Sequence, residues 1–375
     1  MPVTIGVLKE TVPGENRVAV VPEVATRLAA LGARLLVERG AGTAARFPDA
    51  LYKDVAFADS AGAVLEAADI LLTVQPLDAA VAGRLKPGST LIGFIAPHAQ
   101  AALVRALRDR RVTSFAMELV PRISRAQSMD ALSSQAAVAG YKAVLIGAAA
   151  LDKFFPMLTT AAGTIRPATV LVIGAGVAGL QAIATARRLG AVVEAYDVRS
   201  ATREQIKSLG AKFVETGVTA EGAGGYAREL TAEEKAKQQE VLDSRIAAAD
   251  CVITTAGVPG RPAPRIIGRA AVERMKTGAV IVDLLAENGG NCELTRAGET
   301  VDHQGVRIIG PVNLPASVAF HASEMYARNL LNFIKPALAA GALTIDWNDE
   351  VFAASCVTHD GSIRHEPTKK TVEAA

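Results

Sequence analysis

Residues 170–186 read VLVIGAGVAGLQAIATA, and residues 193–199 read VEAYDVR. The apolar start of the first segment is typical of a buried parallel strand. Gly174, Gly176 and Gly179 then keep the G-x-G-x-x-G spacing that opens the helix of a dinucleotide-binding βαβ unit. The first glycine permits a tight turn, the second lets a pyrophosphate approach the backbone, and the third lets the helix pack against the strand. These segments therefore predict a binding site for a nicotinamide dinucleotide.

An acidic residue, Asp197, follows the second apolar strand, where Rossmann-type sites hold a ribose. A carboxylate there accepts hydrogen bonds from the 2′- and 3′-hydroxyls of adenosine and repels a 2′-phosphate, so the sequence favours NAD over NADP. Arg199 and Arg203 weaken this preference, although neither occupies the position expected for a 2′-phosphate contact. Residues 167–186 are uncharged and about as long as a membrane span, but three glycines at nucleotide-turn spacing argue against one.

Length and composition set broad limits. The 375 residues suffice for two or three domains, and a chain that is 50% hydrophobic with one tryptophan suits an alternating α/β protein. The 40 basic and 38 acidic residues are spread along the chain, which argues against nucleic acid or an anionic membrane surface as a partner. Cys251, Cys292 and Cys356 form no C-x-x-C pair, so we expect neither disulfides nor a metal site. With no signal peptide at the start, the sequence predicts a cytoplasmic protein.

Apolar strand-like segments alternate with helical patterns, which predicts βαβ units and parallel sheets covered on both faces. The first third has no G-x-G-x-x-G motif, so we expect an open α/β unit that faces the cofactor without holding its pyrophosphate. Its expected strands are 4–8, 34–38, 70–74, 90–94 and 113–116, and its clearest helices are 22–31 and 99–108. The later expected strands are 212–215, 251–254, 279–284 and 306–309.

The fold class that follows is α/β, with two Rossmann-like open parallel-sheet domains joined by two long helices. A cleft between the domains is the expected place for the nicotinamide. The predicted parts are a first domain (1–130 plus 330–365), a connecting helix region (131–164), an NAD-binding domain (165–316), a return helix (317–340) and a disordered tail (366–375).

The pattern breaks between residues 216 and 240. Residues 221–228 are too rich in glycine for the interior of an element, whereas Thr231 and Glu234 have the spacing of a capping box that begins a helix. A flexible loop with a single aromatic residue, Tyr226, near its tip is typical of a lid over a ligand. An ordinary solvated surface loop fits the same sequence equally well.

Polar side chains gather in residues 117–135, which we place between the domains: Arg122, Arg125, Gln127, Asp130 and Ser133. They could converge on the cleft, or the segment could be only a helix entry capped by Asp130 or Ser128. In the NAD-binding domain, Ala256 and Gly257 follow an expected strand and either approach a ribose of the cofactor or form a plain turn. Asp283 and Glu287 could face the same cleft, but nothing in the sequence gives them a titrating role.

Several motifs accompany the glycine fingerprint: KETVPGENRVA at 9–19, RISRAQSMD at 122–130, SSQ at 133–135, TAAGT at 160–164, AGGYA at 223–227, GGNC at 289–292 and LLNF at 330–333. Together they resemble the NAD(H)-binding component, domain I, of proton-translocating nicotinamide nucleotide transhydrogenase, from residue 1 to about 365. The resemblance implies a two-domain homodimer, peripheral to the cytoplasmic face of the membrane, that docks on NADP(H)-binding and transmembrane subunits. Hydride would pass directly from NADH to NADP⁺, with Si/Re specificity and only when those subunits are present.

The resemblance also implies roles for individual residues. It implies that four of them orient the nicotinamide, with Gln127 reaching toward the partner's nucleotide: Arg122, Gln127, Asp130 and Ser133. It implies that Gly225 and Tyr226 belong to a mobile loop that folds over NAD(H). It places the adenosine and pyrophosphate site at Val177, Asp197, Val198 and Arg199.

Hydride transfer between two nicotinamides moves no proton, so the site needs alignment rather than an acid or a base. The alanine dehydrogenases resemble this chain in several segments, but that family has a lysine and a histidine where this sequence has Gln75 and Ala96, with His98 displaced by two residues. Arg17 is retained but lacks the partner lysine of an amino-acid clamp. Two alternatives stay open: an alanine-dehydrogenase-like enzyme that acts alone, and a non-catalytic NAD-sensing module.

Overall fold

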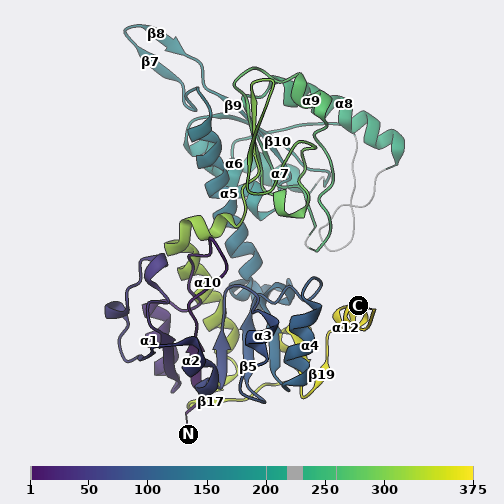
Figure 1. Cartoon of the computed structure of the whole chain (residues 1–375). Helices are drawn as coiled ribbons and strands as arrows, with labels where there is room; N and C mark the ends of the chain where they lie inside the picture. The colour runs from purple at the N-terminus through teal and green to yellow at the C-terminus, as the bar shows by residue number, and fades with distance from the viewer. Residues whose placement is uncertain (1, 200, 218–230, 259, 375) are drawn as a thin grey trace. The chain divides into compact units, whose positions relative to one another are not determined.

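The computed structural model describes residues 2–199, 201–217, 231–258 and 260–374. The chain divides into two compact units, unit 1 (Met1–Gln135 with Pro315–Ala375) and unit 2 (Ala136–Leu314), whose elements are labelled in Figure 1. The division falls inside the long helix α5 (Ala131–Ala150). Most of the predicted connecting region therefore belongs to unit 2, and the predicted return helix belongs to unit 1.

Unit 1 contains an eight-stranded sheet in the order β19-β18-β6-β5-β4-β1-β2-β3. The strands from β6 to β3 are parallel, whereas β18 is antiparallel to both β6 and β19. Their bounds are β1 Thr4–Val7, β2 Arg34–Glu38, β3 Ala56–Ala58, β4 Ile70–Leu72, β5 Thr90–Gly93, β6 Thr113–Ala116, β18 Cys356–His359 and β19 Ser362–Ile363. All five expected strands are present, while β3 and the C-terminal strands were not expected.

Helices cover both faces of this sheet. Because side chains alternate along a strand, Ile70 and Leu72 enter one apolar core and Leu71 enters the other. The first core receives α1 and α10, and the second receives α2 and α4. The helices of unit 1 are α1 Pro22–Ala30, α2 Ala61–Ala67, α3 Ala79–Ala82, α4 Ala101–Asp109, α10 Ala319–Ile334, α11 Glu350–Ser355 and α12 Glu366–Ala374.

The return helix is shorter than expected. Helix α10 ends at Ile334 because Pro336 cannot continue a helix, and a small hairpin follows, made of β16 (Leu338–Ala339) and β17 (Ala342–Leu343). Gly341 lies in the turn with φ of 74°, a conformation that glycine adopts without strain.

The prediction of a disordered tail is wrong for residues 366–374, which form α12. Val372 and Thr368, spaced i, i+4 on one face of this helix, are buried, and Val372 joins the apolar core that contains α4. Arg105 of α4 donates from Nη1 to the carbonyl oxygen of Val372 at 3.2 Å, and Figure 1 shows α12 next to α4. The charged composition suggested a solvated tail, but the charges lie on the face that does not pack.

Unit 2 contains a seven-stranded sheet in the order β11-β10-β9-β12-β13-β15-β14, parallel except for the edge strand β14. Counted from β9, the parallel strands follow the 3-2-1-4-5-6 order of Rossmann-type sheets. The bounds are β9 Thr169–Ile173, β10 Val192–Tyr196, β11 Lys212–Phe213, β12 Cys251–Thr254, β13 Val280–Asp283, β14 Thr300–His303 and β15 Val306–Ile309. The helices are α6 Val177–Arg188, α7 Thr202–Ser208, α8 Ala232–Ala248 and α9 Arg269–Glu273.

Helix α5 packs closely on unit 2 through two glycines. A Cβ added to Gly140 would lie 2.0 Å from the carbonyl oxygen of Ala178, and one added to Gly147 would lie 2.8 Å from Sγ of Cys251. The predicted capping box of α8 is confirmed, since Thr231 Oγ1 accepts from the backbone N–H of Glu234 and the Glu234 carboxylate accepts from that of Thr231.

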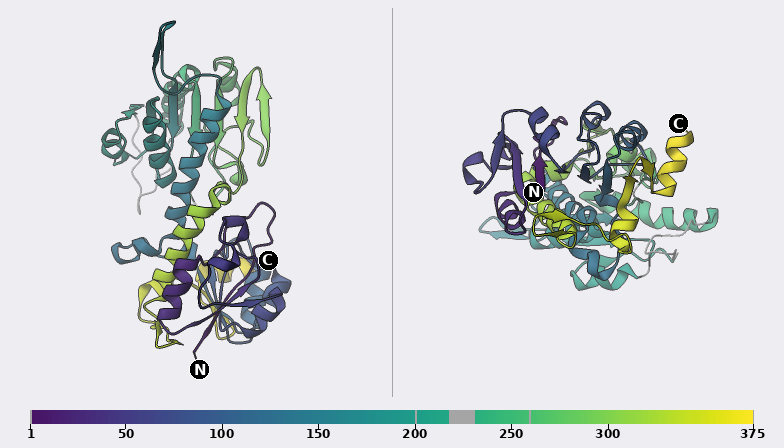
Figure 2. Two further views of the ribbon diagram at one scale, coloured as in Figure 1. Left: turned by 90° about the vertical axis from the view of Figure 1, so that its left-hand side faces the viewer. Right: turned by 90° about the horizontal axis from the view of Figure 1, so that it is seen from below.

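Residues 151–165 are not helical, although the predicted connecting helix region extends to residue 164. They include a hairpin of β7 (Leu158–Thr160) and β8 (Gly163–Ile165), whose residues are all exposed. Figures 1 and 2 show it projecting from the rest of unit 2 as a thin arm. In the ranges that the structure describes, we find no helix with both the length and the apolar character needed to cross a bilayer.

Candidate functional site

The turn between β9 and α6 has the geometry that its three glycines predict. Gly174 has φ of 95°, and a Cβ there would lie 2.8 Å from Oγ1 of Thr255. A Cβ on Gly179 would lie 1.9 Å from the carbonyl oxygen of Gly174, so helix and strand are in backbone contact. A Cβ on Gly176 would meet no atom within 4 Å. The first and third glycines therefore serve packing, and the second leaves an open side from which a phosphate can reach the backbone.

The N-terminus of α6 is suited to an anion. Gly176 is its N-cap, and no side chain caps the helix there. The first N–H groups of a helix have no partner within the helix, and together with the helix dipole they attract phosphate groups. Val177 begins α6 and has 43% of its surface exposed, so an apolar side chain lies beside these donors.

Asp197 lies at the end of β10, directly against the glycine turn. Its carboxylate is buried and accepts the backbone N–H of Ala175 on Oδ2 at 2.8 Å. The guanidinium of Arg199 donates to both oxygens, from Nε to Oδ1 and from Nη2 to Oδ2, each at 2.8 Å, and Arg199 N also donates to Oδ1 at 2.9 Å. The structure thus brings Asp197 to the predicted ribose position and reveals a partner that the sequence did not predict.

Val198 and Arg203, which lie on either side of Arg199 along the chain, have different surroundings. Val198 is half-buried and packs against the apolar core that contains Tyr196. Arg203 donates to the carboxylate of Glu215 at 2.5 Å and lies over the ring of Phe213 at 5.2 Å from its centroid. Arg203, one of the two arginines that weakened the predicted preference for NAD, is therefore engaged at the sheet edge.

Ala256, after β12, lies at the same turn. Thr255 donates from Oγ1 to the carbonyl oxygen of Gly174 at 3.0 Å, which ties the two loops together. The side chain of Asn291, fully buried, accepts from Ala256 N at 3.1 Å and donates to Ala256 O at 2.7 Å. Sequence reasoning missed the role of Asn291, although the preceding pair of glycines, both at positive φ, was a signal of a special turn.

Asp283 is a structural acceptor. Its carboxylate is inaccessible to solvent and receives four hydrogen bonds at 2.7 to 3.0 Å, from Thr254 Oγ1, Leu285 N, Cys292 N and Thr295 Oγ1. Glu287 accepts a longer bond of 3.2 Å from the backbone of Asn313. Both carboxylates therefore fix loops of unit 2.

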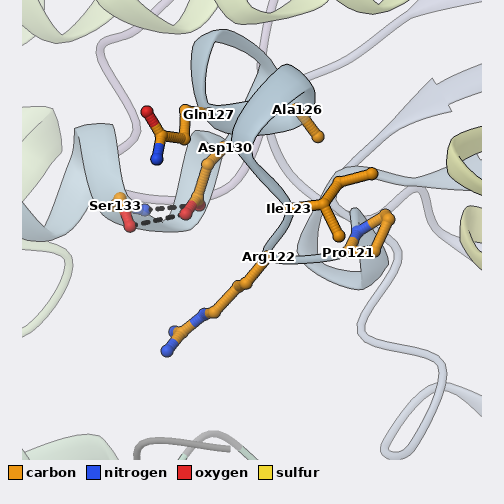
Figure 3. Close-up of a pocket in the computed structure, with 7 residues that line it drawn as sticks. All are labelled: Pro121, Arg122, Ile123, Ala126, Gln127, Asp130 and Ser133. Carbon is orange, nitrogen blue, oxygen red and sulfur yellow. Dashed lines mark hydrogen bonds between the residues drawn. The ribbon is translucent and has the colours of Figure 1, made fainter.

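A polar pocket lies entirely within unit 1. It is formed by residues between the 3₁₀-helix η3 (Met117–Leu119) and the start of α5, including the 3₁₀-helix η4 (Ser124–Met129). It has a volume of about 250 Å³, below the roughly 300–1,000 Å³ of pockets for whole ligands, so it suits one ring of a larger ligand. The residues that line it are Pro121, Arg122, Ile123, Ala126, Gln127, Asp130 and Ser133 (Figure 3).

All four residues expected to orient a nicotinamide therefore line one pocket. Arg122 and Gln127 are exposed, and in Figure 3 the Arg122 side chain extends away from the loop. Asp130 is half-buried and accepts from Ser133 N at 2.8 Å and Ser133 Oγ at 2.6 Å, so it also caps α5. The helix-entry interpretation is therefore confirmed for Asp130, which also lines the pocket. Arg125, by contrast, pairs with Asp349 at 2.7 Å and lines no part of the pocket.

Helix α10 holds the pocket wall in place. Asn329 and Asn332 each donate to the carbonyl oxygen of Ser128, at 2.9 and 3.1 Å, and Asn329 also accepts from Ser134 at 2.7 Å. The buried side chains of Ala126 and Met129 pack in the same apolar core as α10. The LLNF motif contains Asn332 and follows directly after Asn329, but the sequence did not indicate a role for either asparagine.

Gln75 and Ala96, which stand where the alanine dehydrogenases have a lysine and a histidine, carry no side chain that could act as an acid or a base. Gln75 instead belongs to a hydrogen-bond network around Arg17. Arg17 is engaged by the carboxylate of Glu15, at 2.8 and 2.6 Å, and by Gln135 at 2.9 Å, while Gln75 donates to Glu15 at 2.7 Å. Burial raises the pKa of nearby Glu10 to about 7, although the backbone N–H groups at 74 and 75 donate to it. The guanidinium that an amino-acid carboxylate would need is therefore already bound within this network.

Gly225 and Tyr226, the predicted lid residues, lie outside the described residues. Among those that are described, no group of three or more histidine, cysteine, aspartate or glutamate side chains could hold a metal ion.

Comparison with known proteins places these features in a family. Residues 6–139 match the model of the alanine dehydrogenase/PNT N-terminal domain, and residues 143–366 match that of the C-terminal domain. Over 374 residues the chain is 47% identical to the first portion of the NAD(P) transhydrogenase alpha subunit of Rhodospirillum rubrum, covering 96% of this chain and 97% of that protein. The chain belongs to the transhydrogenase alpha-subunit family. The resemblance inferred from its motifs is confirmed.

Two further proteins are similar to this chain over nearly its whole length. The crystal structure of transhydrogenase from Sinorhizobium meliloti is 43% identical, with a TM-score of 0.88 over 96% of this chain and 99% of that one. An alanine dehydrogenase of Mycobacterium tuberculosis is 29% identical over 96% of this chain and 95% of that protein. The predicted α/β class and its two Rossmann-like units are confirmed, and the chain is more similar to these transhydrogenases than to that dehydrogenase.

Proposed function

We propose that the chain is the NAD(H)-binding subunit of a proton-translocating transhydrogenase and passes hydride from NADH to NADP⁺ held by a partner subunit. One observation carries the proposal: the same chain has a glycine turn suited to a dinucleotide in unit 2 and a polar pocket in unit 1. In that pocket, hydrogen bonds from Ser133 hold the carboxylate of Asp130 in place. Such a pocket can orient a ring: Asp130 is the one carboxylate among the seven described residues that line it, and Ser133 donates to both of its oxygens. Orientation of the ring is what direct hydride transfer requires.

The residues at the turn fit NAD(H). The open side of Gly176 and the uncapped start of α6 would hold the pyrophosphate, with Val177 and Ala256 beside it. Asp197 would hold the adenosine ribose and favour NAD over NADP. NADP(H) therefore belongs to the partner subunit.

In the pocket of unit 1, Arg122, Gln127, Asp130 and Ser133 would orient the nicotinamide. NADH supplies the hydride when it is bound, and the side chains contribute alignment, because the reacting ring atoms must approach to about 3–3.5 Å. Gln127, which is exposed, would reach toward the second nucleotide.

The subunit would act as a homodimer bound to NADP(H)-binding and transmembrane subunits at the cytoplasmic face of the membrane. The arm of unit 2 supports a dimer because large apolar side chains beside and on it are exposed: Phe154, Met157, Leu158 and Ile165. A second copy would bury such a surface. Proton flow through the partner subunits would supply about 2.3 kcal/mol per charge and 100 mV, enough to drive a nearly isoenergetic hydride exchange toward NADPH.

The experiment is to mix the purified chain with an NADP(H)-binding component and follow reduction of an NAD analogue by NADPH. We expect rapid reduction that requires both proteins, and no oxidation of L-alanine with NAD⁺ by the chain alone. Turnover of alanine or pyruvate would favour the dehydrogenase alternative. Tight NADH binding without hydride transfer to any NADP(H)-binding component would favour an NAD-sensing module.

A further inference from the structure

The carboxylate of Asp197 has no acceptor position left for a ligand. A carboxylate offers about four lone-pair sites, and this one receives four hydrogen bonds: from Ala175 N, Arg199 N, Arg199 Nε and Arg199 Nη2. Each oxygen accepts one bond from the backbone and one from the guanidinium. The ribose of adenosine would also need one acceptor on each oxygen for its two hydroxyls.

The guanidinium of Arg199 thus occupies the two acceptors that a ribose diol would use. The two backbone donors cannot leave, since Ala175 lies in the glycine turn and the carbonyl of Arg199 accepts from Thr202 N and Oγ1 at 3.2 and 2.7 Å. The side chain of Arg199 is 26% exposed, against 6% for that of Asp197, so the guanidinium is the more accessible of the two partners. Rotation of this one side chain toward solvent would free both acceptors.

The family resemblance counts Arg199 among the residues of the adenosine and pyrophosphate site. We propose instead that Arg199 is an internal competitor for the adenosine-ribose site, which must release Asp197 before NAD(H) binds and which therefore sets nucleotide affinity. The inference rests on the proposed assignment of this turn as the NAD(H) site. Hydrogen bonds between two charged groups are stronger than those from neutral hydroxyls, so exchanging the guanidinium for a ribose diol weakens binding. A competitor of this kind keeps the nucleotide exchangeable, as a subunit that must release NAD⁺ in every cycle requires.

The competitor should also affect the two nucleotides differently. Freeing Asp197 restores an acceptor for a 2′-hydroxyl, but a 2′-phosphate has no proton to donate and is repelled by the carboxylate. Removing Arg199 should therefore tighten the binding of NADH and leave NADPH weak. Removing a cation that does not occupy Asp197, in contrast, should tighten neither dinucleotide, because both are anionic and both lose its attraction.

The test is titration of NADH and NADPH, followed by nucleotide fluorescence, into the wild-type chain and the variants Arg199→Met, Arg199→Lys and Arg203→Met. Arg203→Met is the matched control because it removes one positive charge four residues away, from an arginine paired with Glu215. We expect Arg199→Met to bind NADH about three- to tenfold more tightly, Arg199→Lys to lie between it and wild type, and Arg203→Met to show no gain. NADPH affinity should not rise in any variant.

The proposal is overturned if Arg199→Met binds NADH no better than wild type, or if NADPH gains as much as NADH. Thermal unfolding of each variant shows whether it folds. If Arg199→Met does not fold, the milder Arg199→Lys variant decides: tighter NADH binding than wild type supports the proposal, and equal or weaker binding overturns it. Failure of the wild-type chain to bind NADH would instead defeat the proposed function, and this proposal with it. The two failures are therefore distinguishable.

Discussion

Replacing Gly176 by alanine should remove nucleotide binding while leaving the fold intact. A Cβ at this position would meet no atom within 4 Å, and Gly176 has φ of −76°, which alanine adopts without strain. Alanine is a poorer N-cap than glycine, but it also reduces the entropy of the unfolded chain, so the free energy of unfolding should change by less than about 1 kcal/mol.

The added methyl group would instead occupy the open side that a pyrophosphate must approach. Displacing the phosphate from one backbone N–H loses a charged hydrogen bond worth about 1.5–3 kcal/mol. NADH affinity should therefore fall about ten- to hundredfold. Fluorescence titration of NADH measures this loss, and urea unfolding measures the stability.

Gly179→Ala is the matched control, because it adds the same methyl group one turn along α6. That methyl group would lie 1.9 Å from the carbonyl oxygen of Gly174, so the backbone of the turn must shift. Overpacking of this kind costs about 1–3 kcal/mol of stability. The reasoning is refuted if Gly176→Ala binds NADH like wild type, or if Gly179→Ala is as stable as wild type.

Gln127→Asn should slow hydride transfer in the reconstituted system with NADH affinity nearly unchanged, since Gln127 is exposed at the pocket rim; an unchanged rate would disprove its bridging role. Burial raises the pKa of the Glu10 carboxyl from 4.5 to about 7, so the folded chain binds the carboxyl proton more tightly than the unfolded chain does. The free energy of unfolding of the wild type should therefore fall by up to about 3 kcal/mol as the pH rises from 4.5 to 7. Urea unfolding at several pH values should show this loss reduced in Glu10→Gln, and an identical pH profile would contradict the assignment. Val372→Ala should cost about 1.5 kcal/mol by removing two buried carbon atoms, whereas Lys370→Ala on the exposed face of α12 should be neutral in the same assay.

Local pattern was enough to predict much of the fold. The strands 34–38, 113–116, 251–254 and 306–309 have the same bounds in the sequence prediction and in the structure. Each strand contains at least two buried apolar side chains beside polar residues, so burial of its own side chains determines where it lies. The capping box at Thr231 and the glycine spacing at 174–179 were predictable for a similar reason, because the residues that define each motif lie within a few positions of one another.

Short or mostly polar elements were not predictable. Strand β3 and the strands of the exposed arm have three residues each, too few for a period to show. Strands β18 and β19 join the sheet of unit 1 through pairing with β6, about 240 residues away along the chain. Helix α12 exists because Val372 finds a core contributed by α4.

The sequence by itself determined the candidate site residues, since the residue types and their spacing at the glycine turn, at Asp197 and at 122–133 are local properties. Only the tertiary structure decided what each side chain meets. Asn291 fixes Ala256, Asn329 fixes the wall of the pocket in unit 1, and Arg199 occupies both oxygens of Asp197. Asn291 and Asn329 are distant in sequence from the residues that they hold. The contact of Arg199 with Asp197 depends on a side-chain rotamer that burial and charge select. Neither kind of contact produces a periodic pattern in the sequence.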